Sequence, residues 1–219
     1  MRVGVLASGA GTNLQAILDR LHRRHGIEVA AVASDQPGAP ALERAARAGV
    51  PTAEFPLRAH GDRAARDAAI ADFLAGHGVE LVVLAGYMAL LEPGFLARFP
   101  ERVINVHPAL LPAFPGVRGI EQALDYGVKV FGVTVHFVDE GIDTGPIIAQ
   151  RALELPDADD AAAVRRALRP LEHDLLCDAI ARIARGAVRI DPAHPRRVVV
   201  EPRRPGARRY RPDPWRGRR

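Results

Sequence analysis

The sequence predicts an α/β fold: an open, mostly parallel, twisted sheet of the Rossmann-like kind, with helices on both faces. Three observations support this prediction. Short, fully apolar runs alternate with segments of helical periodicity over the first 107 residues. A glycine-rich turn follows the first apolar run directly, and two longer strand-like segments occur later with no helix between them. This last feature predicts an antiparallel addition to the sheet in the C-terminal half.

The first half of the chain contains the strands and helices of the parallel part. The expected strands cover residues 2–7, 27–33, 51–56, 79–84 and 102–106. The expected helices between them cover residues 12–25, 39–48 and 62–75. The first helix shows the pattern most clearly, because Leu14, Ile17, Leu18 and Leu21 fall on one face at helical spacing. Strands without polar residues are typical of a sheet that is covered on both sides.

The second half contains the two longer strands, at residues 128–138 and 146–155, and a long helix over residues 159–185. Pro170 interrupts the helical pattern, and we expect a kink or a break there. From residue 190 onward Pro and Arg dominate, so residues 190–219 are expected to be mostly disordered. The predicted organisation is one domain over residues 1–189 followed by a basic tail over residues 190–219.

Composition limits the function classes. The chain has 219 residues, 48% of them hydrophobic and 26% charged, which is ordinary for a globular protein. Its single cysteine, Cys177, excludes an intrachain disulfide and a thiolate zinc cluster. The longest apolar run, residues 81–91, is too short to span a bilayer, and no secretory signal is visible. We therefore expect a cytoplasmic protein that binds no metal and no membrane.

The net charge of +4 comes from the C-terminal end. Residues 196–219 contain ten arginines and two acidic residues, a net charge of +8, so the rest of the chain carries −4. A basic balance that is confined to one tail says little about the site in the folded part.

The segment SGAGTN, residues 8–13, joins the first strand to the first helix. Free N–H groups at a helix N-terminus attract an anion, and Gly11, Thr12 and Asn13 are the candidates for holding it. Leu14 breaks the G-x-G-x-x-G dinucleotide pattern and no lysine follows, so one terminal phosphate is favoured. Two alternatives stay open: a dinucleotide whose ribose is held by Asp35, and a plain turn capped by Thr12 or Asn13.

A second polar group is predicted at the end of the strand over residues 102–106, in the segment INVHPALLPAFPG. Asn105 and His107 point the same way, about 6–7 Å apart, because strand side chains alternate. Asp143, in a glycine-flanked loop, would orient an imidazole and favour its protonated form. An amide, an imidazole and a carboxylate suit the stabilisation of a tetrahedral oxyanion during proton transfer. No Ser or Cys nucleophile is predicted nearby, which favours direct transfer between two substrates, and His136 is expected to be a hydrogen-bonded structural residue.

Four segments together carry a resemblance to a known family: VLASGAGTNLQAIL, VVLAGYMALL, INVHPALLPAFPG and GVTVHFVDEGIDTGPII. They closely resemble the phosphoribosylglycinamide formyltransferases (GAR transformylases), which are folate-dependent formyltransferases, over roughly residues 1–188. The resemblance implies transfer of a formyl group from 10-formyltetrahydrofolate to the amine of glycinamide ribonucleotide, in purine biosynthesis. It also implies small-molecule substrates, no metal, and a monomer or homodimer.

The resemblance assigns roles to residues of this sequence. Asn105 and His107 look like the oxyanion donor and the general acid, and Asp143 like the group that holds His107. The residues implied for the ribonucleotide are Gly11, Thr12, Asn13 and Glu172. The residues implied for the folate are Arg63, Met88, Ala89, Leu90, Leu91, Asn105, Glu140 and Gly141. Ala89 and Ile120 depart from the family pattern, which commonly has an arginine and a histidine at these positions.

Three rival functions remain open. A methionyl-tRNA formyltransferase shares the Asn-x-His and Asp apparatus but carries a second domain, for which we expect this chain to be too short. A formyltetrahydrofolate hydrolase usually carries a preceding regulatory domain, which we do not expect here. A non-catalytic nucleotide- or RNA-binding protein would depend on the ten arginines of the basic tail.

Overall fold

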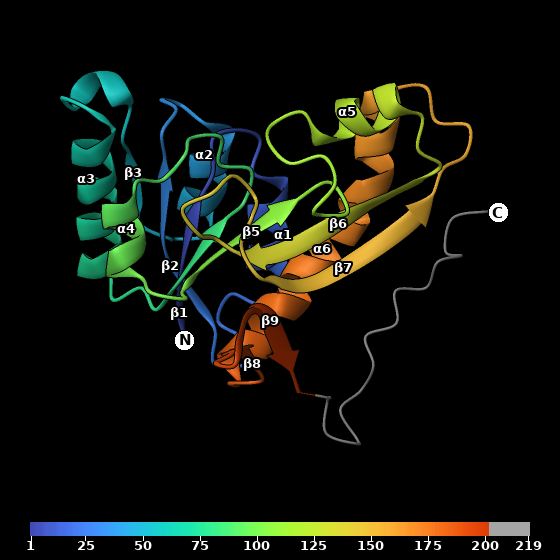
Figure 1. Cartoon of the computed structure of the whole chain (residues 1–219). Coiled ribbons are helices and arrows are strands. Elements are labelled where there is room, and N and C mark those ends of the chain that lie inside the picture. The colour runs from blue at the N-terminus through green and yellow to red at the C-terminus, as the bar shows by residue number, and fades with distance from the viewer. Residues whose placement is uncertain (202–219) are drawn as a thin grey trace.

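A computed structural model describes residues 1–201 of the protein (Figure 1). Its centre is a seven-stranded sheet with the strand order β3-β2-β1-β4-β5-β6-β7. The strands are β1 (Arg2–Leu6), β2 (Glu28–Ser34), β3 (Thr52–Glu54), β4 (Leu81–Leu84), β5 (Val103–His107), β6 (Val130–Phe137) and β7 (Ile147–Glu154). The strands from β1 to β5 pair in parallel, and β6 and β7 pair antiparallel at one side. The predicted fold class is confirmed.

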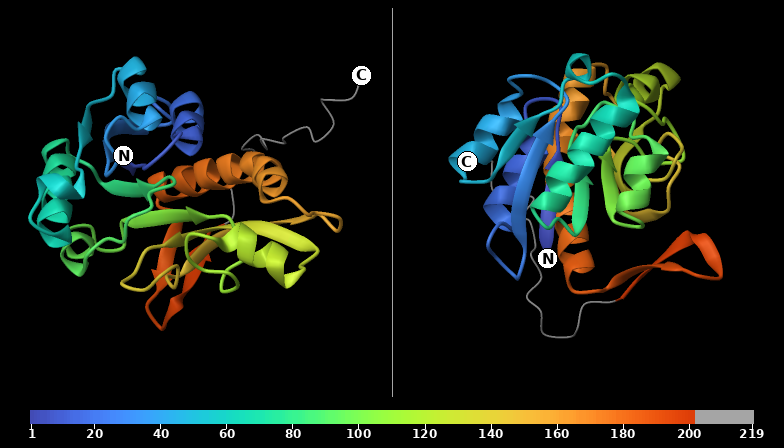
Figure 2. Two further views of the ribbon diagram at one scale, coloured as in Figure 1. Left: turned by 90° about the horizontal axis from the view of Figure 1, so that it is seen from above. Right: turned by 90° about the vertical axis from the view of Figure 1, so that its left-hand side faces the viewer.

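Helices cover both faces of this sheet (Figure 2). The helices are α1 (Thr12–Arg20), α2 (Pro40–Arg47), α3 (Arg63–Gly76), α4 (Pro93–Arg98), α5 (Gly119–Tyr126) and α6 (Ala161–Ala184), with a 3-10 turn η1 (Leu57–Ala59). The buried residues form two clusters, one that includes α1, α2 and α6 and one that includes α3 and α4. Alternate residues of β4 enter opposite clusters, Leu81 and Val83 one, Val82 and Leu84 the other. This explains why the run is apolar throughout.

The topology places the site. The chain winds outward from β1 to β3 and then returns to add β4 and β5 on the other side of β1. The connections after β1 and β4 therefore leave the sheet in opposite directions, and in such sheets ligands bind at this point. A hydrogen bond of 3.0 Å from Ser8 N to Gly86 O joins the two connections.

Helix α6 corrects the expectation of a break at Pro170, because it continues from Ala161 to Ala184 with Pro170 inside it. A proline removes the hydrogen bond to the carbonyl of the residue four positions earlier, here Arg166. Both Pro170 and Arg166 are exposed, so water can bind that carbonyl and the helix need not end. The short helices α4 and α5 were not anticipated.

A C-terminal hairpin corrects a second expectation. Residues 188–200 form β8 (Val188–Asp191) and β9 (His194–Val200), so the disorder expected from residue 190 is wrong for residues 190–200. The hairpin is ordered because Val188, Ile190 and Val198 pack against the main core. The expected disorder of the basic tail beyond residue 201 lies outside the described residues.

Among the helices of residues 1–201, none combines the length and the apolar character needed to cross a bilayer.

Candidate active site

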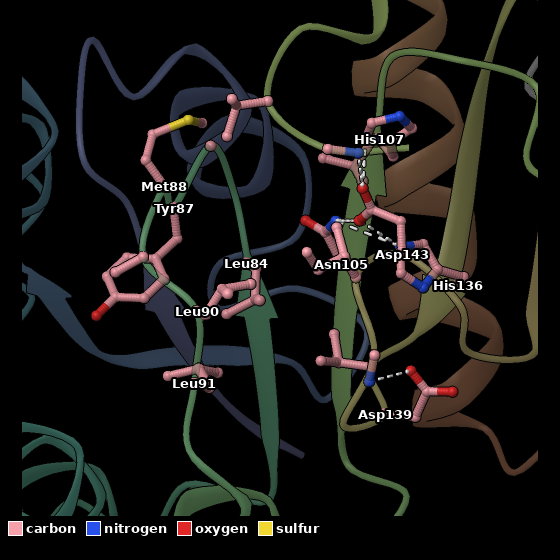
Figure 3. A pocket seen from close by; sticks show the side chains of 18 of the residues that line it. Leu84, Tyr87, Met88, Leu90, Leu91, Asn105, His107, His136, Asp139 and Asp143 are labelled. Atoms are coloured by element: carbon pink, nitrogen blue, oxygen red, sulfur yellow. Dashed lines mark hydrogen bonds and ion pairs between the residues drawn. The ribbon is translucent and has the colours of Figure 1, made fainter. Parts of the chain in front are cut away.

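Three residues predicted to converge do meet. Asn105 and His107 lie on β5, and Asp143 comes from the loop between β6 and β7 (Figure 3). Asp143 Oδ2 lies 3.3 Å from His107 Nδ1, and Asp143 Oδ1 lies 3.2 Å from Asn105 Nδ2. The cluster is largely shielded from water, since His107 is buried and only 13% of the Asp143 side chain is exposed.

Asp143 is held as an ionised carboxylate. Burial alone raises the pKa of Asp143, but hydrogen bonds from His136 and from the N–H of Gly116, with the nearby His107 and His136 rings, outweigh burial and lower it to about 2. The bond from Gly116 N to Oδ2 is 2.7 Å long. Asp143 itself has a left-handed backbone, with φ of 53°, so neighbouring contacts must hold this loop in place. The carboxylate is therefore both charged and fixed in direction.

His107 faces acceptors with both ring nitrogens. Nε2 donates to the carbonyl of Phe114 at 2.8 Å, because a carbonyl can only accept. Nδ1 faces the Asp143 carboxylate at 3.3 Å. Each ring nitrogen therefore faces a hydrogen-bond acceptor. This arrangement suits a residue that gives up a proton or stabilises negative charge.

His136 belongs to the same cluster, which the sequence reasoning missed. Its Nδ1 donates to the carbonyl of Phe137 at 2.7 Å, as a structural histidine would. Its Nε2, however, lies 3.4 Å from Asp143 Oδ1 and 3.3 Å from Asn105 Nδ2. His136 reaches this place because β6 pairs antiparallel with β5 and puts it opposite Asn105. The only signal in the sequence was its position within the later strand, whose register was unknown.

The Asn105 amide has a definite orientation. Its Nδ2 is directed at Asp143 and His136, and its oxygen faces the gap on the other side (Figure 3). A donor role toward a ligand requires a half-turn of the amide, which would bring its oxygen toward the Asp143 carboxylate. Two acceptors repel, so after this turn the amide oxygen would be best placed against a ring N–H of His136 and away from the carboxylate.

An open pocket of about 390 Å³ adjoins the cluster. Its wall opposite the cluster is the segment after β4, where the side chains of Met88 and Leu90 are 58% and 52% exposed (Figure 3). Exposed apolar side chains beside a few polar groups suit a flat, partly apolar ligand. All residues that the sequence assigned to this pocket line it: Arg63, Met88, Ala89, Leu90, Leu91, Asn105, Glu140 and Gly141. Arg63 lies at its edge, half exposed and 3.2 Å from Glu92.

A second pocket of about 260 Å³ lies at the glycine loop. Gly11 precedes α1 with φ of 69°, and a Cβ there would meet Ala41 Cα at 2.7 Å, so only glycine fits. Within residues 1–201, no side chain caps the first turn of α1. The alternative in which Thr12 or Asn13 caps the helix is therefore wrong, and the N-terminal N–H groups remain for a ligand. This pocket shares Gly86 and Met88 with the larger one.

Glu172 joins the glycine loop from α6. Asn13 Nδ2 donates to Glu172 Oε2 at 3.2 Å, across 159 positions of sequence. Burial raises the pKa of Glu172, an effect that the hydrogen bond from Asn13 and the charges of Arg165 and Arg169 only partly offset. The Oδ1 atom of Asn13 is buried and has no partner among the described residues. A ligand with hydroxyl groups would satisfy both side chains.

Asp35, on which the dinucleotide alternative depended, is already hydrogen-bonded within the protein. It accepts hydrogen bonds from Ser8 Oγ and from Gln36 Nε2. Ser8 Oγ in turn accepts from Met88 N at 2.8 Å. Asp35 therefore helps to fix the two connections that form the pockets. Ile120, where relatives commonly have a histidine, is buried in the main core on α5.

Comparisons with known proteins agree with this geometry. The formyl transferase family matches residues 1–180. A phosphoribosylglycinamide formyltransferase of Mycobacterium tuberculosis is 46% identical over 189 residues, covering 86% of this chain and 87% of that protein. One from Bacillus subtilis is 43% identical, covering 78% and 89%.

A solved structure shares the fold as well. A glycinamide ribonucleotide transformylase of Symbiobacterium toebii superposes with a TM-score of 0.87 at 48% identity, covering 91% of this chain and 93% of that one. The chain therefore belongs to the formyl transferase family, in its phosphoribosylglycinamide formyltransferase branch.

Proposed function

We propose that this protein transfers the formyl group of 10-formyltetrahydrofolate to the amine of 5'-phosphoribosylglycinamide, a step of purine biosynthesis. The observation that carries the proposal is the junction of the two pockets at Gly86 and Met88, with the Asn105, His107 and Asp143 cluster in the wall of the larger. A phosphorylated amine held at the glycine loop would reach a formyl carrier held against residues 88–91.

The reaction follows from the groups present. The glycinamide nitrogen attacks the formyl carbon and gives a tetrahedral intermediate with negative charge on oxygen. The His107 ring, once its Nε2–H turns from Phe114 O to the ligand, and the turned Asn105 amide stabilise that oxygen, and Asp143 keeps the ring oriented. Collapse of the intermediate breaks the bond to N10 of the folate. The proton lost by the amine is delivered to N10 through His107, so tetrahydrofolate leaves neutral at that nitrogen.

The binding roles follow the two pockets. Gly11, Thr12 and Asn13 would hold the phosphate through the N-terminus of α1, and Glu172 would accept from the ribose hydroxyls. Met88, Ala89, Leu90 and Leu91 would face the pteridine ring, with Glu140 and Gly141 closing the loop side. Arg63 at the edge would pair with the carboxylates of the folate tail.

The test is an assay of both substrates together. We expect the absorbance change of 10-formyltetrahydrofolate consumption only when glycinamide ribonucleotide is added. Consumption without the ribonucleotide would indicate a hydrolase instead. Formylation of methionyl-tRNA but not of the ribonucleotide would overturn the proposal in favour of the tRNA branch.

Glu172→Gln is expected to raise the Tm at pH 7.5 while it raises the KM for the ribonucleotide. Because the folded-state pKa of Glu172 lies above its ordinary value, the stability it contributes is present at low pH and is lost as pH rises through that raised pKa. The amide copies the protonated state, so the gain in Tm should shrink as the pH falls toward 4. Thermal unfolding across pH checks this, with exposed Glu154→Gln as the control. A Tm gain that is the same at all pH values would contradict the assignment.

The division into a catalytic domain over residues 1–189 and a basic tail stays a prediction, and the hairpin supports placing the boundary near residue 201. Shortening the chain after Glu201 is expected to leave kcat and both KM values unchanged. Shortening it after Gly186 should lower the Tm, because the hairpin packs on the core and Arg196 donates to Thr144 O at 3.0 Å beside the Asp143 loop. Steady-state kinetics and thermal unfolding of both truncated proteins test these expectations. Loss of activity on truncation after Glu201 would show that the tail belongs to the catalytic unit.

We place the reaction in the cytoplasm, with the protein as a monomer or homodimer. The one cysteine, Cys177, is a buried free thiol, which fits a reducing compartment.

A further inference from the structure

A buried ion pair lies on α3, outside the two pockets described above. Arg66 and Asp67 are 3% and 1% exposed, and Arg66 Nε and Nη2 both donate to Asp67 Oδ1, at 2.8 and 2.7 Å. Neither residue lines the pocket beside the Asn105, His107 and Asp143 cluster. Two buried charges cost desolvation free energy that their attraction only offsets in good geometry, so such a pair is weak support for stability as such.

The remaining donor and acceptor of the pair hold the pocket wall. Arg66 Nη2 donates to Leu90 O at 3.3 Å, and Asp67 Oδ2 accepts from Glu92 N at 2.8 Å. These two backbone groups belong to the segment between β4 and α4, which has neither helix nor strand. The same segment presents Met88 and Leu90 to the open pocket.

The segment has other supports, most of them near β4. Ala85 N donates to Leu6 O at 2.9 Å, Ser8 N donates to Gly86 O at 3.0 Å, and Met88 N donates to Ser8 Oγ at 2.8 Å. Nearer α4, Arg63 of α3 makes a half-exposed contact with Glu92, and Leu91 packs against the core cluster that includes α3 and α4. The Ser8 contact fixes the end nearest the ribonucleotide pocket. At the end nearest α4, the backbone of Leu90 and Glu92 is hydrogen-bonded to the ion pair. A charged bond to each of two backbone groups two residues apart sets both the position and the tilt of that stretch.

We propose that Arg66 and Asp67 are positioning residues that fix the 88–92 wall and thereby set the affinity for the reduced folate without taking part in the chemistry. This inference rests on the proposed function. It assigns the two residues a role in folate binding but none in the ribonucleotide site, whose own supports are Ser8, Gly11 and Glu172. A role in fixing one wall predicts a change in folate affinity alone.

The test removes both charges together, so that neither is left buried without a partner. In Arg66→Met/Asp67→Leu we expect a folded protein, because apolar replacement of a buried pair is often neutral or stabilising. The Kd for tetrahydrofolate and the KM for 10-formyltetrahydrofolate should rise by about 10- to 100-fold, the range expected for losing charged hydrogen bonds. The kcat at saturating folate and the KM for the ribonucleotide should stay near the wild-type values.

The matched control is Asp72→Asn/Arg98→Gln, which removes an exposed ion pair of 2.8 Å that joins the same helix to α4. It should leave both folate constants unchanged. If the apolar variant does not fold, Arg66→Gln/Asp67→Asn keeps an amide donor and acceptor at these positions and should show a smaller rise in the folate constants. Unchanged folate constants in either folded variant, or a fall in kcat without a change in KM, would overturn the inference.

Direct binding of tetrahydrofolate separates this inference from the proposed function. If the wild-type protein binds no tetrahydrofolate and transfers no formyl group, the proposed function is wrong and the inference falls with it. If the wild type binds and the variant binds equally well, only the inference is wrong. Isothermal titration calorimetry on the full chain gives both answers.

Discussion

Asp143→Asn is expected to lower kcat by about 10²–10⁴, the range for removing a group that controls proton transfer. The carboxylate faces His107 Nδ1 and His136 Nε2 at 3.3 and 3.4 Å, and it also receives the N–H of Gly116. An amide cannot offer a charged acceptor to both imidazole rings, and its NH₂ end would face a ring N–H. The KM for the ribonucleotide should change little, because Glu172 and the glycine loop are untouched.

The variant must be shown to fold. The depressed pKa of Asp143 means that its stabilising effect is present above its unfolded-state value, near 4, and is lost as pH falls through about 2. At neutral pH the Asn variant should therefore have a somewhat lower Tm, and circular dichroism below the Tm should match the wild type. His107→Ala should cause a loss of similar size, and the double variant should lose little more, because the two residues act as one unit. Additive losses, or a near-normal kcat in a folded single variant, would refute the role.

Gly145→Ala is expected to lower kcat by about 10²-fold or more, since a misplacement of 1 Å far from the reacting atoms can have that effect. A Cβ at Gly145 would overlap Phe137 O and lie 2.8 Å from Phe137 C, which are backbone atoms of β6. Neither can move without breaking the strand, so the loop that carries Asp143 must shift instead. Asp143 would then leave His107, although its own side chain is unchanged.

The control for this prediction is Gly76→Ala, at the end of α3, where an added Cβ meets no atom within 4 Å. It should leave kcat unchanged. Steady-state kinetics and thermal unfolding of both variants make the comparison. A Gly145→Ala protein with wild-type kcat would show that the loop's position does not govern catalysis.

The parallel part of the fold was predictable because burial on both faces of the sheet produces apolar patterns within short stretches of sequence. A strand such as β4 has no polar side at all, and the helix after β1 repeats its apolar residues at 3.6-residue spacing. The site residues Asn105 and His107 were predictable for a similar reason, since strand alternation fixes their common direction. The glycine loop was predictable because glycines follow the first apolar run directly. In the structure, Gly11 has a left-handed backbone and lies so close to Ala41 that no side chain fits.

Other parts of the structure depended on tertiary contacts that no short sequence pattern reveals. Pro170 predicts a kink or a break, but the helix does not break there, because Pro170 and Arg166 are exposed and the α6 core residues on either side are buried. The hairpin of β8 and β9 looked like a disordered segment because three arginines and two prolines stand among the three apolar residues that pack on the core. His136 entered the site through the register of β6 on β5, which strand composition does not specify.

The sequence by itself determined the layer architecture, the glycine-rich turn after the first strand and the identity of the three polar groups, because each of these follows from residue type and short-range spacing. The tertiary structure alone decided which groups meet and how they are charged. Asp143 is ionised because of His107, His136 and Gly116, and two backbone groups of the 88–92 segment are hydrogen-bonded to an ion pair on α3. Distances between residues far apart in the chain depend on packing of the whole core, which no local pattern encodes.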